Sequence, residues 1–208
     1  MKGSIFIVSS PSGCGKTTII RNFLENSRNF YFSISHTTRP KRPKEVNGKD
    51  YFFISKEKFQ EMIDNNEFLE WAVVHNQYYG TSKKNVIEKI ENGINVILDI
   101  DVQGAKKIKE NQDLKKYDIV SIFIFPPSYE ELKNRIVKRG QDSEESVNIR
   151  LNNAYNELKE FRLYDYIIVN KNLKKAIYDF TTIINANFLK LEKMENFAEK
   201  ILNTWRDR

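Results

Sequence analysis

The chain has 208 residues, of which 40% are hydrophobic and 30% are charged, so the sequence predicts one sizeable globular core that can carry small inserted lobes. No apolar run approaches the roughly 20 residues that cross a bilayer, and Cys14 as the single cysteine excludes an intramolecular disulfide, so we expect a cytoplasmic protein without a membrane partner. The net charge of +6 comes without a dense Lys/Arg block, which favours small phosphorylated ligands over nucleic acid.

The first half of the chain alternates apolar strands with helical segments, apart from one irregular stretch. The patterns predict, in chain order, a buried strand at 5–8, a helix at 18–25, short strands of a small sheet at 30–34 and 51–54, a helix from Ser55 to Ile63, a strand at 68–74, a helix from Ser82 to Glu91 and a buried strand at 95–101. The segment from about 34 to 85 breaks the alternation with short strands and closely spaced turns. We interpret it as an inserted lobe and not as a separate domain.

The second half of the chain continues the alternation up to a helical tail. Here the patterns predict a buried strand at 119–125 stopped by two prolines, a helix up to Arg139 that opens with a capping box of Ser128 and Glu131, a charged helix at 143–161, a strand at 166–169 and one long helical tail. Continuous apolar strands between helices indicate a parallel sheet that is covered on both faces. The predicted fold class is therefore α/β with three layers.

Residues Ser10 to Thr17 join the first strand to the first helix and read Ser-Pro-Ser-Gly-Cys-Gly-Lys-Thr. This is the phosphate-binding P-loop pattern with Ser10 in place of the first glycine, and a serine fits there if its φ is negative. Gly13 and Gly15 allow the backbone N–H groups to point inward at an anion. Lys16 adds a charge for the β- and γ-phosphates, and the Thr17 hydroxyl can bind Mg²⁺. A glycine-rich connection without function is the alternative, but the flanking strand and helix favour triphosphate binding.

A second informative stretch runs from Ser35 to Tyr51 and reads Ser-His-Thr-Thr-Arg-Pro-Lys-Arg, then Pro-Lys, then Glu-Val-Asn-Gly-Lys-Asp-Tyr. It places Arg39 and Arg42 before Tyr51, and planar arginine forks together with a phenol suit a phosphate group. With these motifs the chain resembles the guanylate kinase family. The resemblance extends from Ser4 to the helical tail and includes Glu70-Trp71, Tyr78 to Thr81, Leu98 to Gly104, Arg135 to Gly140 and Ile168 to Asn170.

The resemblance implies a P-loop kinase that transfers the γ-phosphate of ATP to GMP, giving ADP and GDP in purine nucleotide metabolism, with Mg²⁺ as cofactor. It also implies one domain over residues 1–208, made of a core (1–33, 94–134 and 151–208), a small mixed α/β GMP-binding lobe (34–93) and a helical lid (135–150). The residues implied to bind ATP are Ser12, Gly13, Cys14, Gly15, Lys16, Thr17, Thr18 and, near the adenine, Asn170.

For GMP the resemblance implies a phosphate site and a base site. The phosphate would be held by Arg39, Arg42, Tyr51 and Tyr79. Glu70 would accept hydrogen bonds from an edge of guanine that adenine does not present, so a wrong base would leave the carboxylate unpaired. Further contacts to the base would come from Ser35, Thr81 and Asp101.

The implied catalytic groups are cations, because charge spreads over the transferring phosphoryl oxygens and no covalent intermediate is needed. They are Lys16, Arg39, Arg135, Arg139 and Arg150. Arg135 and Arg139 lie four residues apart and therefore on one helix face. Asp99 and Asp101 share a strand face. We assign Asp99, with Thr17, to Mg²⁺ and Asp101 to the nucleotide, and capping of the next helix is the alternative for one of the two aspartates.

Other functions are compatible with parts of this pattern. Another nucleoside monophosphate kinase would share the P-loop, but Glu70 and the paired arginines favour guanine. A catalytically inactive guanylate-kinase-like module that binds phosphorylated partners typically lacks a working P-loop, whereas this one keeps Gly15, Lys16 and Thr17. A nucleic-acid-binding protein would explain the positive charge but not the acidic base-recognition positions.

The helical tail carries apolar residues at helical spacing. They are Leu191, Met194, Phe197 and Ile201. An amphipathic helix of this kind packs its apolar face on another surface. That surface is either the chain's own core or a second copy in a homo-oligomer, and the sequence favours the second only weakly.

Overall fold

Parallel strands form the central sheet of the protein, whose computed structural model describes residues 2–74, 76–138 and 143–206. Their order is β2 (Phe30–Ser33), β7 (Asn95–Asp99), β1 (Ile5–Ser9), β8 (Ile119–Phe125) and β9 (Tyr166–Val169). β1, β7 and β8 are largely buried, because their continuous apolar side chains point to both faces of the sheet. β1 lies between β7 and β8, so the segments that follow these three strands meet at one edge of the sheet.

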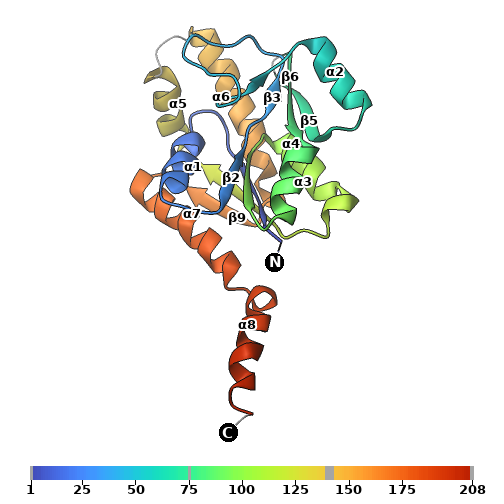
Figure 1. The fold of residues 1–208 in the computed structure, drawn as a ribbon. Coiled ribbons are helices and arrows are strands. Elements are labelled where there is room, and N and C mark those ends of the chain that lie inside the picture. Colours follow the sequence, from blue (N-terminus) through green and yellow to red (C-terminus); the bar gives the residue numbers. More distant parts are fainter. Residues whose placement is uncertain (1, 75, 139–142, 207–208) are drawn as a thin grey trace.

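Helices cover both faces of this sheet (Figure 1). One face packs against α1 (Lys16–Glu25), α5 (Tyr129–Lys138) and α7 (Leu173–Phe188), and the other against α3 (Lys83–Glu91) and α4 (Val102–Glu110). α6 (Glu144–Lys159) contributes side chains to the apolar clusters on both faces. Short 3₁₀ helices, η1 (Gln112–Leu114) and η2 (Glu160–Leu163), follow α4 and α6. The predicted three-layer α/β fold is confirmed.

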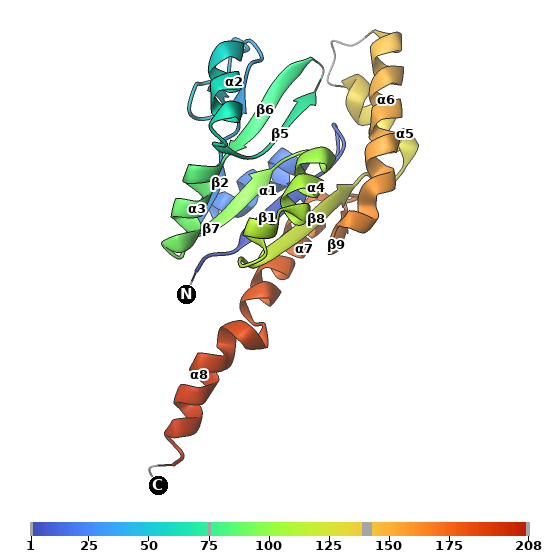
Figure 2. The same ribbon diagram turned by 90° about the vertical axis from the view of Figure 1, so that its right-hand side faces the viewer.

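A smaller mixed sheet lies in the part of the chain between β2 and α3. Its order is β4 (Phe52–Phe53), β3 (His36–Thr37), β6 (Gln77–Ser82) and β5 (Phe68–Val74). α2 (Lys56–Asp64) packs beside it, and the rings of Phe59 and Phe68 stack with centroids 4.5 Å apart. Figures 1 and 2 show this lobe beyond the edge of the central sheet where β1 and β7 end.

The sequence grouped residues 30–34 with 51–54 in one small sheet, and the structure corrects this. β2 pairs in parallel with β7, with Phe30 opposite Asn95, so it is the edge strand of the central sheet. β4 lies in the small sheet, as expected. Both segments are short and rich in aromatic residues, and local composition does not reveal which sheet such a strand joins.

Serine side chains cap helices at the predicted positions. Ser55 Oγ accepts a hydrogen bond from the backbone N–H of Lys58 (3.2 Å) at the start of α2, and Ser82 Oγ accepts from Asn85 (3.4 Å) at the start of α3. Ser128 Oγ accepts from the backbone N–H of Glu131 (3.2 Å), as its predicted capping box requires. These caps satisfy N–H groups that the first helical turn leaves without partners.

The predicted single helical tail is wrong, because the chain breaks at Leu189 and Lys190 into α7 and α8 (Leu191–Asn203). Lys190 has ψ 143, outside the helical range. Figures 1 and 2 show α8 extending away from the body of the molecule. Within the described ranges, none of the helices combines the length and the apolar character that crossing a membrane requires.

Candidate active site

The P-loop follows β1 and leads directly into α1. Gly13 and Gly15 have φ of +96° and +88°, a region that is strained for residues with a Cβ. Among the described residues, the non-glycine positions with positive φ are asparagines, so Ser10 has a negative φ. A negative φ is what a serine needs in place of the first glycine of the P-loop pattern. The N-terminus of α1 faces the loop with its unpaired N–H groups and positive dipole end. The local geometry is therefore that of an anion-binding loop.

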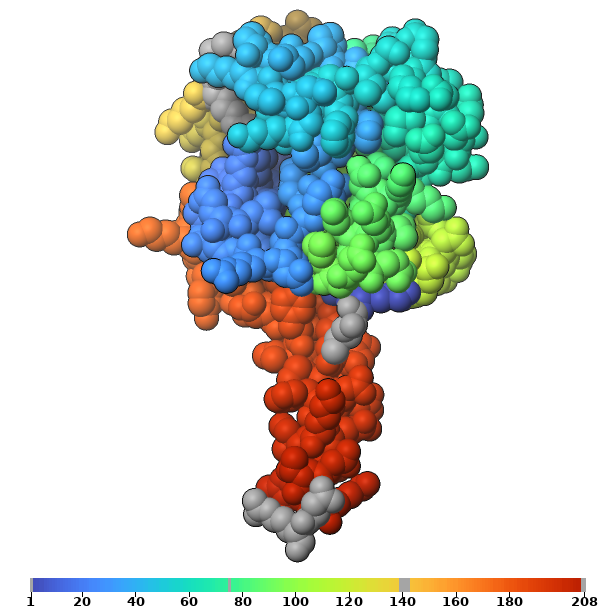
Figure 3. All heavy atoms as spheres, viewed as in Figure 1, coloured from blue at the N-terminus to red at the C-terminus, as the bar shows by residue number. Residues whose placement is uncertain are grey.

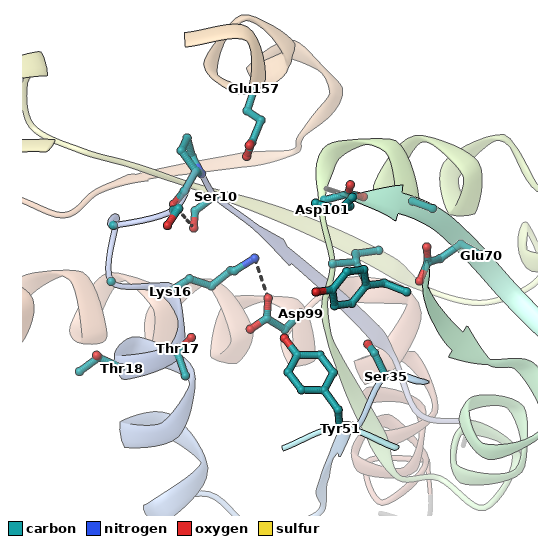
Figure 4. Close-up of a pocket in the computed structure, with 18 residues that line it drawn as sticks. Ser10, Lys16, Thr17, Thr18, Ser35, Tyr51, Glu70, Asp99, Asp101 and Glu157 are labelled. Carbon is teal, nitrogen blue, oxygen red and sulfur yellow. Dashed lines mark hydrogen bonds and ion pairs between the residues drawn. The ribbon is translucent and has the colours of Figure 1, made fainter. Parts of the chain in front are cut away.

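Lys16, the first residue of α1, reaches across the loop to the end of β7. Its Nζ lies 2.6 Å from Asp99 Oδ1, and both side chains are mostly buried. Figure 4 shows this pair at the centre of the site, with Thr17 beside it. Hydroxyl and carboxylate oxygens are suitable ligands for Mg²⁺, either directly or through water. Thr17 and Asp99, the predicted metal residues, both line the same cleft.

Asn170 packs against the back of the P-loop. Its Nδ2 donates to the carbonyl oxygen of Cys14 (2.8 Å), and a Cβ on Gly15 would lie only 2.5 Å from that Nδ2. Gly15 is therefore required by close approach as well as by its φ. Cys14 is fully buried here, which agrees with a packing role. The resemblance placed Asn170 near adenine, and that role stays a prediction, since the contact seen is to the loop backbone.

The predicted lid arginines that the structure describes lie on α5 and α6. Arg150 donates through Nη2 to Ser12 Oγ (2.8 Å). Arg135 donates through Nη2 to the carbonyl oxygen of Asn170 (3.0 Å) and through Nε to Glu131 (3.0 Å). Arg139 lies outside the described residues. Arg150 thus contacts the P-loop directly, whereas Arg135 contacts Asn170 behind it.

Arg39 is oriented by an ion pair on the lobe side. Its Nη2 lies 2.7 Å from Glu45 Oε1, and the other oxygen of Glu45 accepts from the backbone N–H of Arg42 (2.8 Å). The guanidinium also lies 5.4 Å from the ring centroid of Tyr51. Hydrogen bonding to Glu45 raises the pKa of Arg39, and hydrogen bonding from Arg39 lowers the pKa of Glu45.

Tyr51 and Tyr79 come from different parts of the lobe and meet edge to face, with ring centroids 5.9 Å apart. Burial, followed by the nearby Asp99 carboxylate, raises the pKa of Tyr51 to about 12. Its phenol therefore keeps its proton at neutral pH and can donate to a phosphate. The predicted phosphate-binding tyrosines are thus adjacent to each other and to Arg39.

Glu70 lies on β5 and is 7% exposed. Its Oε1 accepts from Thr81 Oγ1 (2.6 Å), and a Cβ on Gly104 would lie 2.6 Å from its Oε2. Burial is the main reason that the pKa of Glu70 rises to about 7, and the Asp101 carboxylate adds to the rise. Asp101 Oδ1 accepts from the backbone N–H of Gly104 (2.8 Å) and so caps α4. The capping alternative therefore applies to Asp101, which also lines the cleft described next.

One cleft of about 410 Å³ connects the P-loop with Glu70 (Figure 4). The predicted residues that it brings together are Ser12, Gly13, Gly15, Lys16, Thr17, Thr18, Ser35, Tyr51, Glu70, Tyr79, Asp99 and Asp101. Other described residues that were predicted for the site do not line the cleft; they are Cys14, Arg39, Arg42, Thr81, Arg135, Arg150 and Asn170. The contact that joins Arg42 to Glu45 comes from the backbone of Arg42, whose side chain is exposed. A second cavity of about 490 Å³ shares Thr17, Ser35, Tyr51 and Asp99 and continues along α1.

Glu157 on α6 lines the cleft but was not predicted from the sequence. Burial is the main cause that raises its pKa to about 7, opposed by Lys16 and reinforced by Asp101. Figure 4 shows its carboxylate pointing into the space above Lys16. The signal that could have indicated it is spacing, because Glu157 lies seven residues after Arg150 and thus on the same helix face. Glu45, which orients Arg39, was likewise not singled out.

The comparisons with known proteins agree with this geometry. A family model described as guanylate kinase matches residues 2–187. The guanylate kinase of Clostridium tetani is 45% identical over 195 residues, which are 94% of this chain and 91% of that protein. The chain belongs to the guanylate kinase family. The guanylate kinase of Thermotoga maritima is 46% identical over 201 residues, 96% of this chain and 95% of that protein.

A solved structure extends the likeness to the fold. The crystal structure of guanylate kinase from Anaplasma phagocytophilum matches with a TM-score of 0.75 and 36% identity, covering 91% of this chain and 88% of that chain. The predicted family and enzyme class are thus confirmed, and the inactive binding module is not favoured.

Proposed function

We propose that the cleft holds ATP and GMP side by side, with the P-loop binding the phosphoryl donor and the lobe binding the acceptor. The observation that carries this proposal is the continuity of the cleft, which is lined at one end by Lys16 and at the other by the buried Glu70. If two nucleotides occupied this cleft, their phosphate groups would face each other between Lys16 and Glu70. The reaction is the transfer of the γ-phosphate of ATP to GMP, giving ADP and GDP.

The donor site is made from the segment that runs from Ser12 to Thr18. Its backbone N–H groups and the N-terminus of α1 would hold the phosphate chain, because both present partial positive charge to an anion. Lys16 would leave Asp99 and move its charge to the β- and γ-phosphates. Arg150 would likewise leave the Ser12 hydroxyl and bind a phosphate oxygen, because a phosphate oxygen is the stronger acceptor.

The acceptor site has a cationic end and an acidic end. Arg39, Arg42, Tyr51 and Tyr79 would bind the GMP phosphate. Glu70, with Ser35, Thr81 and Asp101, would bind the guanine base. Adenine presents an acceptor where guanine N1 carries a proton, so AMP would place an acceptor against the buried Glu70 carboxylate where GMP places a donor.

The chain's residues contribute to transfer by position and charge. Lys16, Arg39 and the lid arginines would surround the transferring phosphoryl group and offset the charge that develops on its oxygens. Closure of the lobe and lid would exclude water that otherwise hydrolyses ATP. No nucleophilic side chain is required, because a phosphate oxygen of GMP attacks the γ-phosphorus directly.

Mg²⁺ fits the residues on the P-loop side of the cleft. The described ranges contain no group of three or more His, Cys, Asp or Glu side chains that could hold a metal on their own. Mg²⁺ in kinases is typically bound by one or two protein oxygens together with substrate phosphates, and Thr17 and Asp99 offer such oxygens. When bound, the ion would neutralise phosphate charge.

A coupled assay with ATP and each of GMP, AMP, CMP and UMP tests the assignment. We expect turnover with GMP and little with the other three acceptors. Lys16→Ala should abolish turnover, and Glu70→Ala should impair GMP use far more than ATP binding. Glu67→Ala, an exposed change just before the same strand, serves as the control. Equal losses of GMP and ATP binding in Glu70→Ala would overturn the base-recognition role.

Two broader expectations also belong to the proposal. A cytoplasmic location suits a kinase that draws on intracellular nucleotides, and cell fractionation tests it. A homo-oligomer is the second expectation, because Leu191, Met194, Phe197 and Ile201 follow helical spacing in the C-terminal tail, and light scattering on the full chain tests it. Figure 3 shows this tail as a column that leaves the body of the molecule.

A further inference from the structure

Glu157 on α6 places a carboxylate in the cleft. Its side chain is half-buried, and Figure 4 shows the carboxylate pointing into the space above Lys16. Within residues 2–74, 76–138 and 143–206, no hydrogen bond or ion pair reaches this carboxylate. An ionised carboxylate only accepts hydrogen bonds, and removing it from water without a donor is unfavourable. A ligand that fills the cleft and excludes water must therefore present a donor to Glu157.

Glu157 lies between the two ends of the cleft. The charge of Lys16, at the P-loop end, and the charge of Asp101 both act on its carboxylate. Asp101 lies beside Glu70 at the other end, because a Cβ on Gly104 would be 2.6 Å from Glu70 Oε2 and 3.3 Å from Asp101 Oδ1. The Glu157 carboxylate thus faces the middle of the cleft.

The packing of α6 fixes this position. Val147, Leu151 and Ala154 are the buried residues of the helix, and their spacing of four and three residues places them on one inner face. Glu157 comes three residues after Ala154 and continues that face. Arg150, seven residues earlier and about 10 Å away along the helix axis, contacts the P-loop. One helix therefore presents a cation to the P-loop and a carboxylate to the middle of the cleft.

The position of Glu157 identifies the part of a nucleotide that it can contact, and here the inference rests on the proposed function. With guanine at Glu70 and the GMP phosphate at Tyr51 and Arg39, the ribose that joins them occupies the middle of the cleft. Figure 4 shows Glu157 and Tyr51 on opposite sides of that space, so the phosphate is turned away from Glu157. A phosphate beside a carboxylate is repelled, whereas a ribose hydroxyl can donate a hydrogen bond to it.

We propose that Glu157 binds the ribose of GMP by accepting a hydrogen bond from its 2′- or 3′-hydroxyl. The contact adds a third point of recognition to the acceptor site, after the base and the phosphate. A hydrated Mg²⁺ ion is a less suitable partner, because Figure 4 shows its predicted ligands, Thr17 and Asp99, on the far side of Lys16 from Glu157. The partner of this carboxylate is thus the sugar of the acceptor and not the metal-bound triphosphate.

Kinetics with GMP, 2′-deoxy-GMP and 3′-deoxy-GMP as acceptors test the contact. Glu157→Ala should lower kcat/KM for GMP about tenfold, mostly through a higher KM, as expected for one charged hydrogen bond. The loss should largely disappear with the deoxynucleotide that lacks the bonded hydroxyl, because that contact is already absent. Glu157→Gln keeps an acceptor oxygen and should recover part of the loss. Glu160→Ala, which removes the charge of an exposed residue three positions later, should behave like the wild type.

The outcomes separate this contact from the proposed function. Equal losses with all three acceptors in Glu157→Ala would overturn the ribose contact and leave the transfer from ATP to GMP in place. A raised Mg²⁺ requirement with an unchanged preference among the acceptors would also overturn it and assign Glu157 to the metal. A wild-type chain that does not phosphorylate GMP would overturn the proposed function and the contact with it. Circular dichroism checks folding, and if alanine is not tolerated, the same comparison among acceptors in Glu157→Gln decides.

Discussion

Lys16 Nζ lies 2.6 Å from Asp99 Oδ1, so the lysine of the phosphate loop is paired with the carboxylate that ends the neighbouring strand. The pair keeps Lys16 in the cleft and satisfies a largely buried cation. In the proposed function, a triphosphate that binds Lys16 would replace this partner, and Asp99 would then be available to a metal ion. The pair would thus position Lys16 for the phosphates and Asp99 for the ion that accompanies them.

Asp99→Asn should reduce activity and raise the Mg²⁺ concentration needed for half-maximal rate. Asparagine keeps the size of the side chain but loses the charge that would hold a hydrated cation. The rate at a fixed Mg²⁺ concentration should fall about 10- to 100-fold, as it does when residues that hold a metal's direct ligands are changed. Initial rates over a Mg²⁺ series measure it.

Asp101→Asn is the matched control, because asparagine caps a helix about as well as aspartate and α4 should keep its N-cap. It should change the dependence on GMP and leave the Mg²⁺ requirement near that of the wild type. If both variants shifted the Mg²⁺ requirement equally, the assignment of Asp99 alone to the metal would be wrong.

Glu70 should make the protein less stable as the pH rises through the weakly acidic range. Burial raises its pKa from 4.5 to about 7, so the folded chain holds this proton more tightly than the unfolded chain. The free energy of unfolding is then unaffected by this group below about pH 4.5, falls as the pH rises toward 7, and is constant above that. The full effect is at most about 3 kcal/mol. Urea unfolding at a series of pH values measures this slope.

Glu70→Gln should flatten that slope while keeping an oxygen for the Thr81 hydroxyl. Some slope should persist, because burial raises the pKa of Glu157 in the same direction. Glu67→Gln, an exposed change nearby, should leave the slope as it is. A slope in Glu70→Gln identical to the wild type would mean that Glu70 is ionised throughout this range.

Elements set by local pattern could be predicted from the sequence. β8 has the predicted bounds, Ile119–Phe125, and the serine caps lie where expected. β3 was not predicted, because its two residues owe their conformation to β6, more than forty residues later. The break before α8 contains neither glycine nor proline, and Lys193 fixes it through Asp118, which is distant in the sequence. Contacts of that kind leave no local pattern.

The residues of the candidate site also differ in whether a local sequence pattern could predict them. The P-loop and the Arg39 segment carry fixed spacings, so their residues could be named from the sequence alone. Asn170 could be associated with the donor site only by resemblance, and its hydrogen bond to Cys14 depends on how β9 lies against the loop. Glu157 looks like one more charge on a charged helix until the packing of α6 turns it into the cleft.

Glu45→Gln should weaken GMP binding by about tenfold, which corresponds to one charged hydrogen bond. The substitution removes the carboxylate that holds Arg39 at 2.7 Å and that also accepts from the backbone of Arg42. The KM for GMP should rise more than kcat falls, because Glu45 acts by orienting groups that bind the phosphate. Glu57→Gln, an exposed change in the same lobe, should have no such effect. A loss confined to kcat would contradict this role.

Gly104→Ala should impair GMP recognition although Gly104 is not itself one of the predicted GMP-binding residues. A Cβ at this position would lie 2.6 Å from Glu70 Oε2 and 3.0 Å from Glu70 Cδ, so the buried carboxylate must move. Gly104 lies in α4, where alanine has the better helix propensity, and its φ is not positive, so the helix itself should tolerate the change. Titration calorimetry should show weaker GMP binding and nearly unchanged ATP binding. Gln103→Ala, one residue earlier and exposed, is the control and should bind both nucleotides normally. Equal losses of ATP and GMP binding in Gly104→Ala would mean that the substitution disrupts α4 as a whole and does not act by displacing Glu70.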